Sequence, residues 1–188
     1  MDFSWVKELA EQSNVLEEGR RAKDRAEKED QRTVALATAP FVEKLYHLFN
    51  TCGDEFNKFV NYNQLRVTTT RVQKKVKGTI NPEDPELSYP EEVAYFIFSR
   101  GDWTYGVRGG RGAVEFIEFP NAGGGPNLSL RLDETAVAPS RKLIATIDSA
   151  TGQIVWSSEE GPVDGPAIVS ICRDYFRDFI EKTNPHAP

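Results

Sequence analysis

The sequence has few of the residues whose chemistry is easiest to recognise. Among its 188 residues are two cysteines, Cys52 and Cys172, and two histidines, His47 and His186. So few cysteines exclude a disulfide scaffold, and without a Cys/His cluster the ligand spacing of a metal site is missing. No Gly-x-Ser-x-Gly motif occurs, so elbow-type hydrolase chemistry is unsupported. We therefore expect no metal, no cofactor and no catalytic residue that the sequence alone identifies.

Long apolar runs are also missing, and we expect no secretory leader. No stretch approaches the roughly 20 apolar residues that cross a bilayer. The start, Met1-Asp2-Phe3, carries an acid where a signal peptide needs basic residues. Both cysteines fit small apolar positions on helix faces, with a disulfide between them as the alternative. Together these features predict a cytoplasmic protein with no membrane span.

An acidic charge balance limits the partners that the sequence predicts. The chain has 23 Lys+Arg and 29 Asp+Glu, a net charge of −6, which argues against a general nucleic-acid binder. This average hides segregation of the charges. Six acids and six bases lie in residues 17–32, five bases without an acid in residues 64–80, and five acids without a base in residues 82–92. A local basic surface is therefore compatible with the acidic chain.

Residues 1–33 are predicted to form a charged helical arm. Apolar residues at positions 3, 5, 6, 9 and 16 are separated by polar ones, and the charge block after them has favourable i,i+4 pairs such as Glu17 with Arg21. Val6, Leu9 and Leu16 begin an a/d frame, but two heptads are too few to indicate a coiled coil. We expect either a solvated arm or an arm that docks on a second protomer or another partner.

Two helices with aromatic faces flank the rest of the chain. Over residues 34–62 apolar side chains recur every three or four positions, which predicts a helix packed on a sheet. Pro40 fits near its start with Thr38 as a cap, so a helix continuous with the arm should bend near residues 38–40. Residues 163–183 show the same periodicity, with Asp164 as the N-cap and Pro166 in the first turn.

The residues between these helices predict an antiparallel meander. Apolar stretches of strand length are separated by turn residues, with no helical stretch between them, which indicates about six to eight strands. The fold class is therefore α+β, with N-terminal helices, the meander, and a C-terminal helix on the same sheet face. We expect one domain over residues 34–184 and a disordered tail over residues 185–188. The candidate strands are 64–72, 74–80, 92–100, 102–108, 112–119, 127–132, 141–148 and 152–157.

Basic and aromatic residues of the first strands are candidate contacts for an anionic or protein partner. The glycine-rich residues 106–112 fit a β-hairpin turn, because a strand follows where a phosphate loop needs a helix. The alternative for this stretch is anion capture by Arg108 or Arg111. For the basic strands, the alternative is an edge that its lysines protect from aggregation. The candidate contact residues are Arg66, Arg71, Lys75, Arg100, Trp103, Tyr105, Arg108 and Arg111.

One short segment carries a family resemblance. Asp148-Ser149-Ala150-Thr151-Gly152-Gln153-Ile154-Val155-Trp156 resembles the hairpin motif of quinoprotein-type β-propeller repeats. The motif occurs once, whereas a propeller needs several copies. The resemblance implies a hairpin in which Gly152 adopts a left-handed conformation, and it implies nothing about function.

Three functions are compatible with these features. The first is a non-enzymatic interaction or adaptor protein, which binds a protein partner or itself through the arm and an exposed sheet face. The second is a carrier of a small apolar ligand or lipid, with a pocket between helices and curved sheet. That pocket would be lined by Phe49, Phe56, Phe96 and Phe176. The third is an enzyme whose site the sequence does not reveal. The scarcity of catalytic motifs favours the first.

Overall fold

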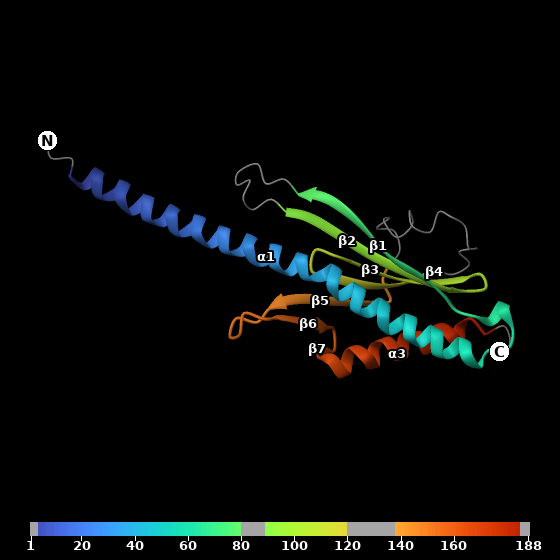
Figure 1. Ribbon diagram of the computed structural model, residues 1–188. Coiled ribbons are helices and arrows are strands. Elements are labelled where there is room, and N and C mark those ends of the chain that lie inside the picture. The colour runs from blue at the N-terminus through green and yellow to red at the C-terminus, as the bar shows by residue number, and fades with distance from the viewer. Residues whose placement is uncertain (1–3, 80–88, 120–137, 185–188) are drawn as a thin grey trace.

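The protein is a twisted antiparallel sheet with two helices on one of its faces (Figure 1). The computed structural model describes residues 4–79, 89–119 and 138–184, with side chains over residues 4–70, 93–119 and 138–184. Within these residues the order is helix, seven strands, helix. The α+β fold predicted from the sequence is confirmed.

One helix, α1 (Ser4–Phe59), forms both the arm and the first core helix. Its 56 residues extend about 84 Å at 1.5 Å per residue. Pro40 lies inside it on the exposed side, where water can satisfy the carbonyl that loses its N–H donor. The expectation that Thr38 caps a helix start is wrong, because the helix continues on both sides of Thr38. The Thr38 hydroxyl is fully buried and donates to the Val34 carbonyl at 3.2 Å.

The strands follow one another in chain order across the sheet, and every neighbouring pair is antiparallel. The expected strands 64–72 and 74–80 are a single strand with an irregularity between Thr70 and Gln73, and the last short strand was not expected. The expected strand 127–132 and the tail 185–188 lie outside the described residues. The strands are β1 (Thr68–Thr79), β2 (Tyr89–Arg100), β3 (Trp103–Gly110), β4 (Ala113–Phe119), β5 (Arg141–Ile147), β6 (Ile154–Ser158) and β7 (Gly161–Val163).

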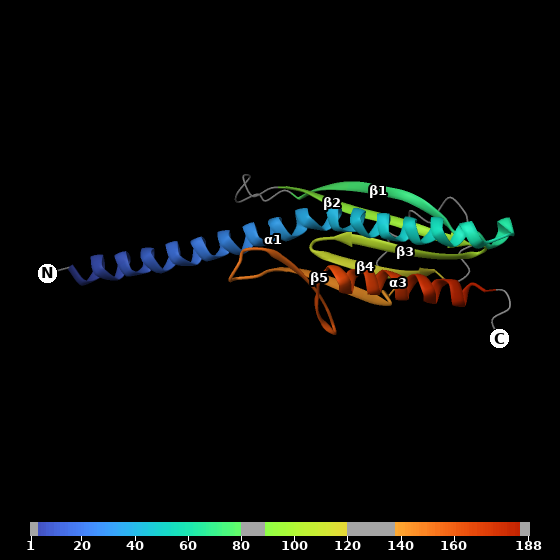
Figure 2. The ribbon, with the colours of Figure 1, turned by 60° about the horizontal axis from the view of Figure 1, so that its bottom comes forward.

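The second half of α1 and the C-terminal helix α3 (Gly165–Lys182) lie beside each other over the sheet (Figure 2). As predicted, Asp164 caps α3, with its carboxylate accepting from the Ala167 amide at 2.8 Å. The core between helices and sheet is aromatic. The Phe98 ring stacks on Phe49 at 4.9 Å and meets Phe179 edge-on at 4.8 Å. A second, smaller buried cluster on the opposite sheet face comprises Tyr95, Ile117 and Phe119.

The glycine-rich stretch is the β3–β4 hairpin, and its glycines allow close contact with α1. Gly110 pairs with Ala113 across a two-residue turn in which Arg111 and Gly112 have positive φ angles of 53° and 76°. The Gly112 amide donates to the Thr38 hydroxyl of α1 at 3.0 Å. A Cβ on Gly109 would come within 2.4 Å of a Val42 methyl group. The predicted hairpin turn is therefore confirmed, and these glycines fit it against the helix.

This close approach predicts that Gly109→Ala destabilises the protein. The new methyl group would meet both Val42 and, at 2.9 Å, Thr38. Both are fully buried β-branched residues with little rotamer freedom, so the substitution should cost about 1–3 kcal/mol of unfolding free energy. Urea denaturation of the full chain measures it. Gly165→Ala is the control, because a Cβ there meets nothing within 4 Å. Equal midpoints for the two variants would contradict the packing described.

Candidate functional site

The first half of α1 is an exposed arm. Every described residue from Ser4 to Val34 is exposed or half-exposed, and Ala35 is the first buried residue. We call residues 4–33 the arm; it is about 45 Å long, and Figure 1 shows it projecting beyond the sheet. Residues 5–16, which we call the tip, expose large apolar side chains, with Trp5 59% and Leu16 75% accessible. The complete set is Trp5, Val6, Leu9, Val15 and Leu16.

Residues 17–33, the spacer, are helical although they bury no apolar face. Ion pairs along the helix surface support this segment. Arg20 contacts Glu17 at 2.8 Å and Asp24 at 3.0 Å, and Arg21 contacts Glu17 at 3.0 Å. Hydrogen bonds from Arg20 and then from Arg21 lower the pKa of Glu17 to about 2. Such i,i+3 and i,i+4 pairs stabilise a helix without tertiary contacts, so the spacer holds the tip away from the sheet.

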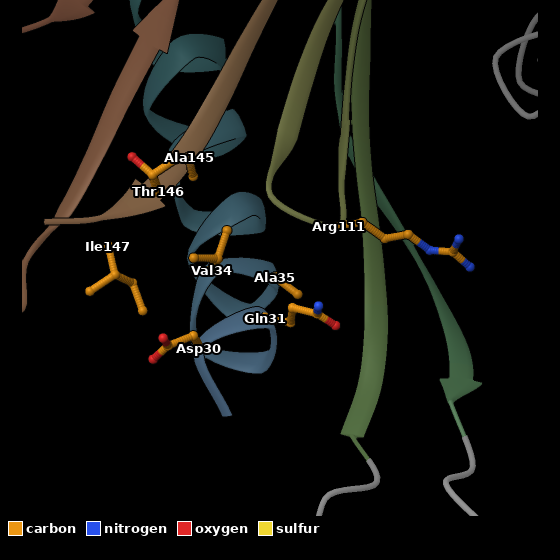
Figure 3. A pocket seen from close by; sticks show the side chains of 8 residues that line it. All are labelled: Asp30, Gln31, Val34, Ala35, Arg111, Ala145, Thr146 and Ile147. Atoms are coloured by element: carbon orange, nitrogen blue, oxygen red, sulfur yellow. The ribbon is translucent and has the colours of Figure 1, made fainter. Parts of the chain in front are cut away.

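A groove lies where the arm leaves the sheet, and we call it the root groove. It has a volume of about 440 Å³. Figure 3 shows α1 side chains on one side of it and β5 side chains on the other, with Arg111 extending away from them. Asp30 and Arg111 are the charged residues of its lining, and the others are apolar or neutral. The lining residues are Asp30, Gln31, Val34, Ala35, Arg111, Ala145, Thr146 and Ile147.

The eight candidate contact residues do not share one surface. Trp103 and Tyr105 lie on the face that the helices cover, and Tyr105 is fully buried. Arg108 belongs to the opposite face, where it contacts Glu115. Arg111 is exposed in the β3–β4 turn. Arg66 is exposed beside the short 3-10 helix η1 (Asn63–Leu65). Arg71 and Lys75 belong to β1, but their side chains lie outside the described residues.

Arg100, the remaining member of that set, is buried and acts as a structural clamp. It is 7% exposed. Its guanidinium donates to the Leu65 carbonyl at 2.9 Å, to the Ile180 carbonyl at 3.1 Å and to the Thr183 hydroxyl at 3.2 Å. These bonds join the end of β2 to the segment before β1 and to the C-terminal end of α3. The sequence showed a cation next to a turn but none of these distant acceptors.

A polar cluster ties α3 to the sheet. The Tyr105 hydroxyl donates to Asp178 at 3.2 Å, while Lys182 contacts Asp178 at 2.9 Å and Glu118 at 3.0 Å. Burial raises the pKa of Tyr105, and the hydrogen bond to Asp178 chiefly raises the pKa of Lys182. Both shifts move titration further from neutral pH. Tyr105 therefore stays protonated and Lys182 charged, which suits a structural link better than general acid–base catalysis.

The four phenylalanines predicted to line a pocket pack against other aromatic rings. Phe49 and Phe96 are almost completely buried and 5.7 Å apart, and Phe56 meets Phe176 edge-on at 6.2 Å. These distances are typical of aromatic pairs in direct contact. The carrier function stays a prediction, and the rings belong to the core that holds α1 and α3 on the sheet.

The opposite sheet face, which the sequence predicted to be exposed, carries both exposed and buried side chains. Lys142, Ile144 and Thr146 of β5 are exposed there, with Ile144 48% accessible. Tyr95 and Ile117 of the same face are buried. Among the described side chains, this face therefore exposes fewer large apolar residues than the tip. The sequence analysis missed the root groove altogether, because its residues come from three segments far apart in the chain.

The ion pairs of the spacer predict an acid-sensitive arm. Glu17 has a lowered pKa, so its contribution to helix stability is complete above its unfolded value of 4.5 and is lost as pH falls towards 2. Carboxyl NMR titration of the full chain should give a midpoint near 2 for Glu17, and Arg20→Ala/Arg21→Ala should return it towards 4.5. The same midpoint in both proteins would show that these arginines do not bind Glu17 in solution.

The clamp predicts that Arg100→Gln destabilises the fold. Three acceptors lose a charged donor in a buried site, so we expect a loss of about 2–4 kcal/mol in unfolding free energy. Arg66→Gln is the matched control, because Arg66 is an exposed arginine near the same loop, and it should change stability by about 0.5 kcal/mol or less. Thermal and urea unfolding measure both. A small effect at Arg100 would contradict the structural role.

Comparisons with protein-family models, with curated proteins and with solved structures give no match to this chain. Among the described residues, no group of three or more His, Cys, Asp or Glu side chains is placed to hold a metal ion. No helix within those residues is long and apolar enough to cross a membrane. The function must therefore be inferred from the arm, the groove and the packing of this chain itself.

Proposed function

We propose that the protein is a non-enzymatic interaction protein that binds another protein molecule through the tip of its arm. The observation that carries this proposal is the exposure of five large apolar side chains, Trp5 and Leu16 among them, on a helical segment, residues 5–16, in which every residue is exposed. Single exposed apolar residues are ordinary, but such residues repeated along an unpartnered helix are typical of recognition sites.

The energetics of an isolated helix support a binding role. Most helical stability in proteins comes from packing an apolar face, and a helix without it is marginal in water. The spacer compensates with its ion pairs, whereas among described residues the tip has the single exposed pair Lys7–Glu11 at 3.7 Å. Burial of a leucine or similar side chain contributes about 1.5–3 kcal/mol. A partner would therefore stabilise the tip as helix and gain affinity from the same contacts.

The attachment of the arm also suits recognition. The tip, spacer and core helix are one continuous helix, so the sheet fixes the direction in which the tip points. Binding then requires less ordering than it would for a free peptide, which lowers its entropic cost. By contrast, the polar cluster around Lys182 serves the fold, and the phenylalanines of the predicted pocket contact one another. These contacts favour the interaction protein over the carrier and the enzyme.

Site-specific photo-crosslinking tests the proposal in the full chain. Benzoylphenylalanine at Leu9 should form a discrete protein adduct in cells that express the protein, because Leu9 lies in the middle of the tip. The same probe at Leu36 is the control, since Leu36 is also an exposed leucine of α1 but lies beyond the arm. Equal adduct yields at the two positions would contradict recognition through the tip.

A further inference from the structure

We propose that the tip binds the tip of a second copy of this chain, with the two helices antiparallel and their two-fold axis between Ala10 and Glu11. This inference rests on the proposed function and names the partner. It follows from the arrangement of the exposed side chains of the tip, which is nearly the same when read from either end.

A stripe of the tip that is apolar apart from Gln12 has this symmetry. At 100° per residue, Trp5, Leu9, Gln12 and Leu16 lie in one stripe about 60° wide. Their steps of 4, 3 and 4 positions read the same in both directions. An antiparallel partner therefore places Trp5 opposite Leu16 of the second copy and Leu9 opposite Gln12 of the second copy. The contact is isologous, as a two-fold dimer requires.

The flanking residues agree with this pairing. Val6 and Val15 lie about 90° to either side of the stripe, so each covers one edge of the seam. The three apolar side chains of the stripe would thus lose contact with water together, with the two valines at the rim of the contact. The charged groups leave the centre of the seam free. Lys7 lies on the far side of the helix, and Glu8 lies at the edge of the seam, about 70° from its centre and beside the Val15 of the second copy.

The size of this interface limits its strength. The tip is about 18 Å long, so two paired tips bury less than the roughly 1,200 Å² of a standard stable complex. We therefore expect a weak dimer that forms at high concentration. Because apolar contact holds it, added salt should not weaken it, whereas a partner held by opposite charges would dissociate as salt screens the attraction.

Sedimentation equilibrium of the full chain measures the dimer. Leu16→Glu should raise the dissociation constant at least about tenfold, since it places a charge in the seam. Leu36→Glu introduces the same charge at the exposed control position of α1 and should leave the dissociation constant unchanged. Both variants have exposed sites, so folding is not at risk, and circular dichroism checks it. A monomer at every concentration, or equal effects of the two variants, would overturn the proposal.

A disulfide assay fixes the orientation. Equal amounts of Trp5→Cys and Leu16→Cys protein, oxidised together with oxidised glutathione, should give a mixed disulfide dimer. Trp5→Cys alone should not, because its two sulfur atoms would lie about 16 Å apart along the axis. Wild-type protein controls for Cys52 and Cys172. A Trp5→Cys homodimer would indicate parallel helices and refute this pairing.

Different experimental results would contradict recognition through the tip and self-pairing of the tip. If the Leu9 photo-adduct contains a different protein and the pure chain stays monomeric, recognition through the tip stands and self-pairing is wrong. If no adduct exceeds the Leu36 control, both are wrong. If the adduct is a second copy of the chain crosslinked near residue 12, both are supported.

Discussion

The packing of the second half of α1 on the sheet is the contact on which the rest of the structure depends. Val42, Leu45 and Phe49 are almost completely buried, and Phe49 touches rings from β2, β4 and α3. The β3–β4 hairpin approaches the same helix closely enough that only glycine fits at position 109. Because α1 does not end at the edge of the sheet, this one contact also orients the arm.

Several features could be predicted from the sequence because short-range patterns determine them. The three- and four-residue spacing before Phe49 and around Phe179 indicated the two aromatic helix faces. Asp164 lies where an N-cap is expected, and the β5–β6 hairpin has its left-handed glycine at position 152, with φ 67°. The spacer was recognised as helical from its i,i+4 charges. In each case the partners lie within a few residues of one another.

The features that escaped prediction depend on distant partners. The acceptors of Arg100 lie 35, 80 and 83 positions away, so an apparent surface cation is a buried clamp. The Thr38 hydroxyl accepts from the Gly112 amide, 74 positions away. The sequence around Thr38 does not show this partner, so a residue inside the helix was predicted to be an N-cap. Tyr105 belongs to a stretch in which apolar and other side chains alternate, as in a strand. That alternation does not indicate which sheet face the helices cover. The described side chains of the candidate contact set are therefore divided between both sheet faces, the β3–β4 turn and the loop beside η1.

The continuity of α1 gives the protein the mechanics of a lever. Ala35 is the first buried residue and the point at which the helix is held. About 45 Å of exposed helix extends from it towards the N-terminus. A sideways pull on the tip cannot be absorbed at a joint, since no loop separates the arm from the core helix. The load falls instead on the first turns beyond Ala35, where the Thr38 hydroxyl holds the Gly112 amide. A force on the arm would therefore first strain the hydrogen bond between α1 and the β3–β4 hairpin.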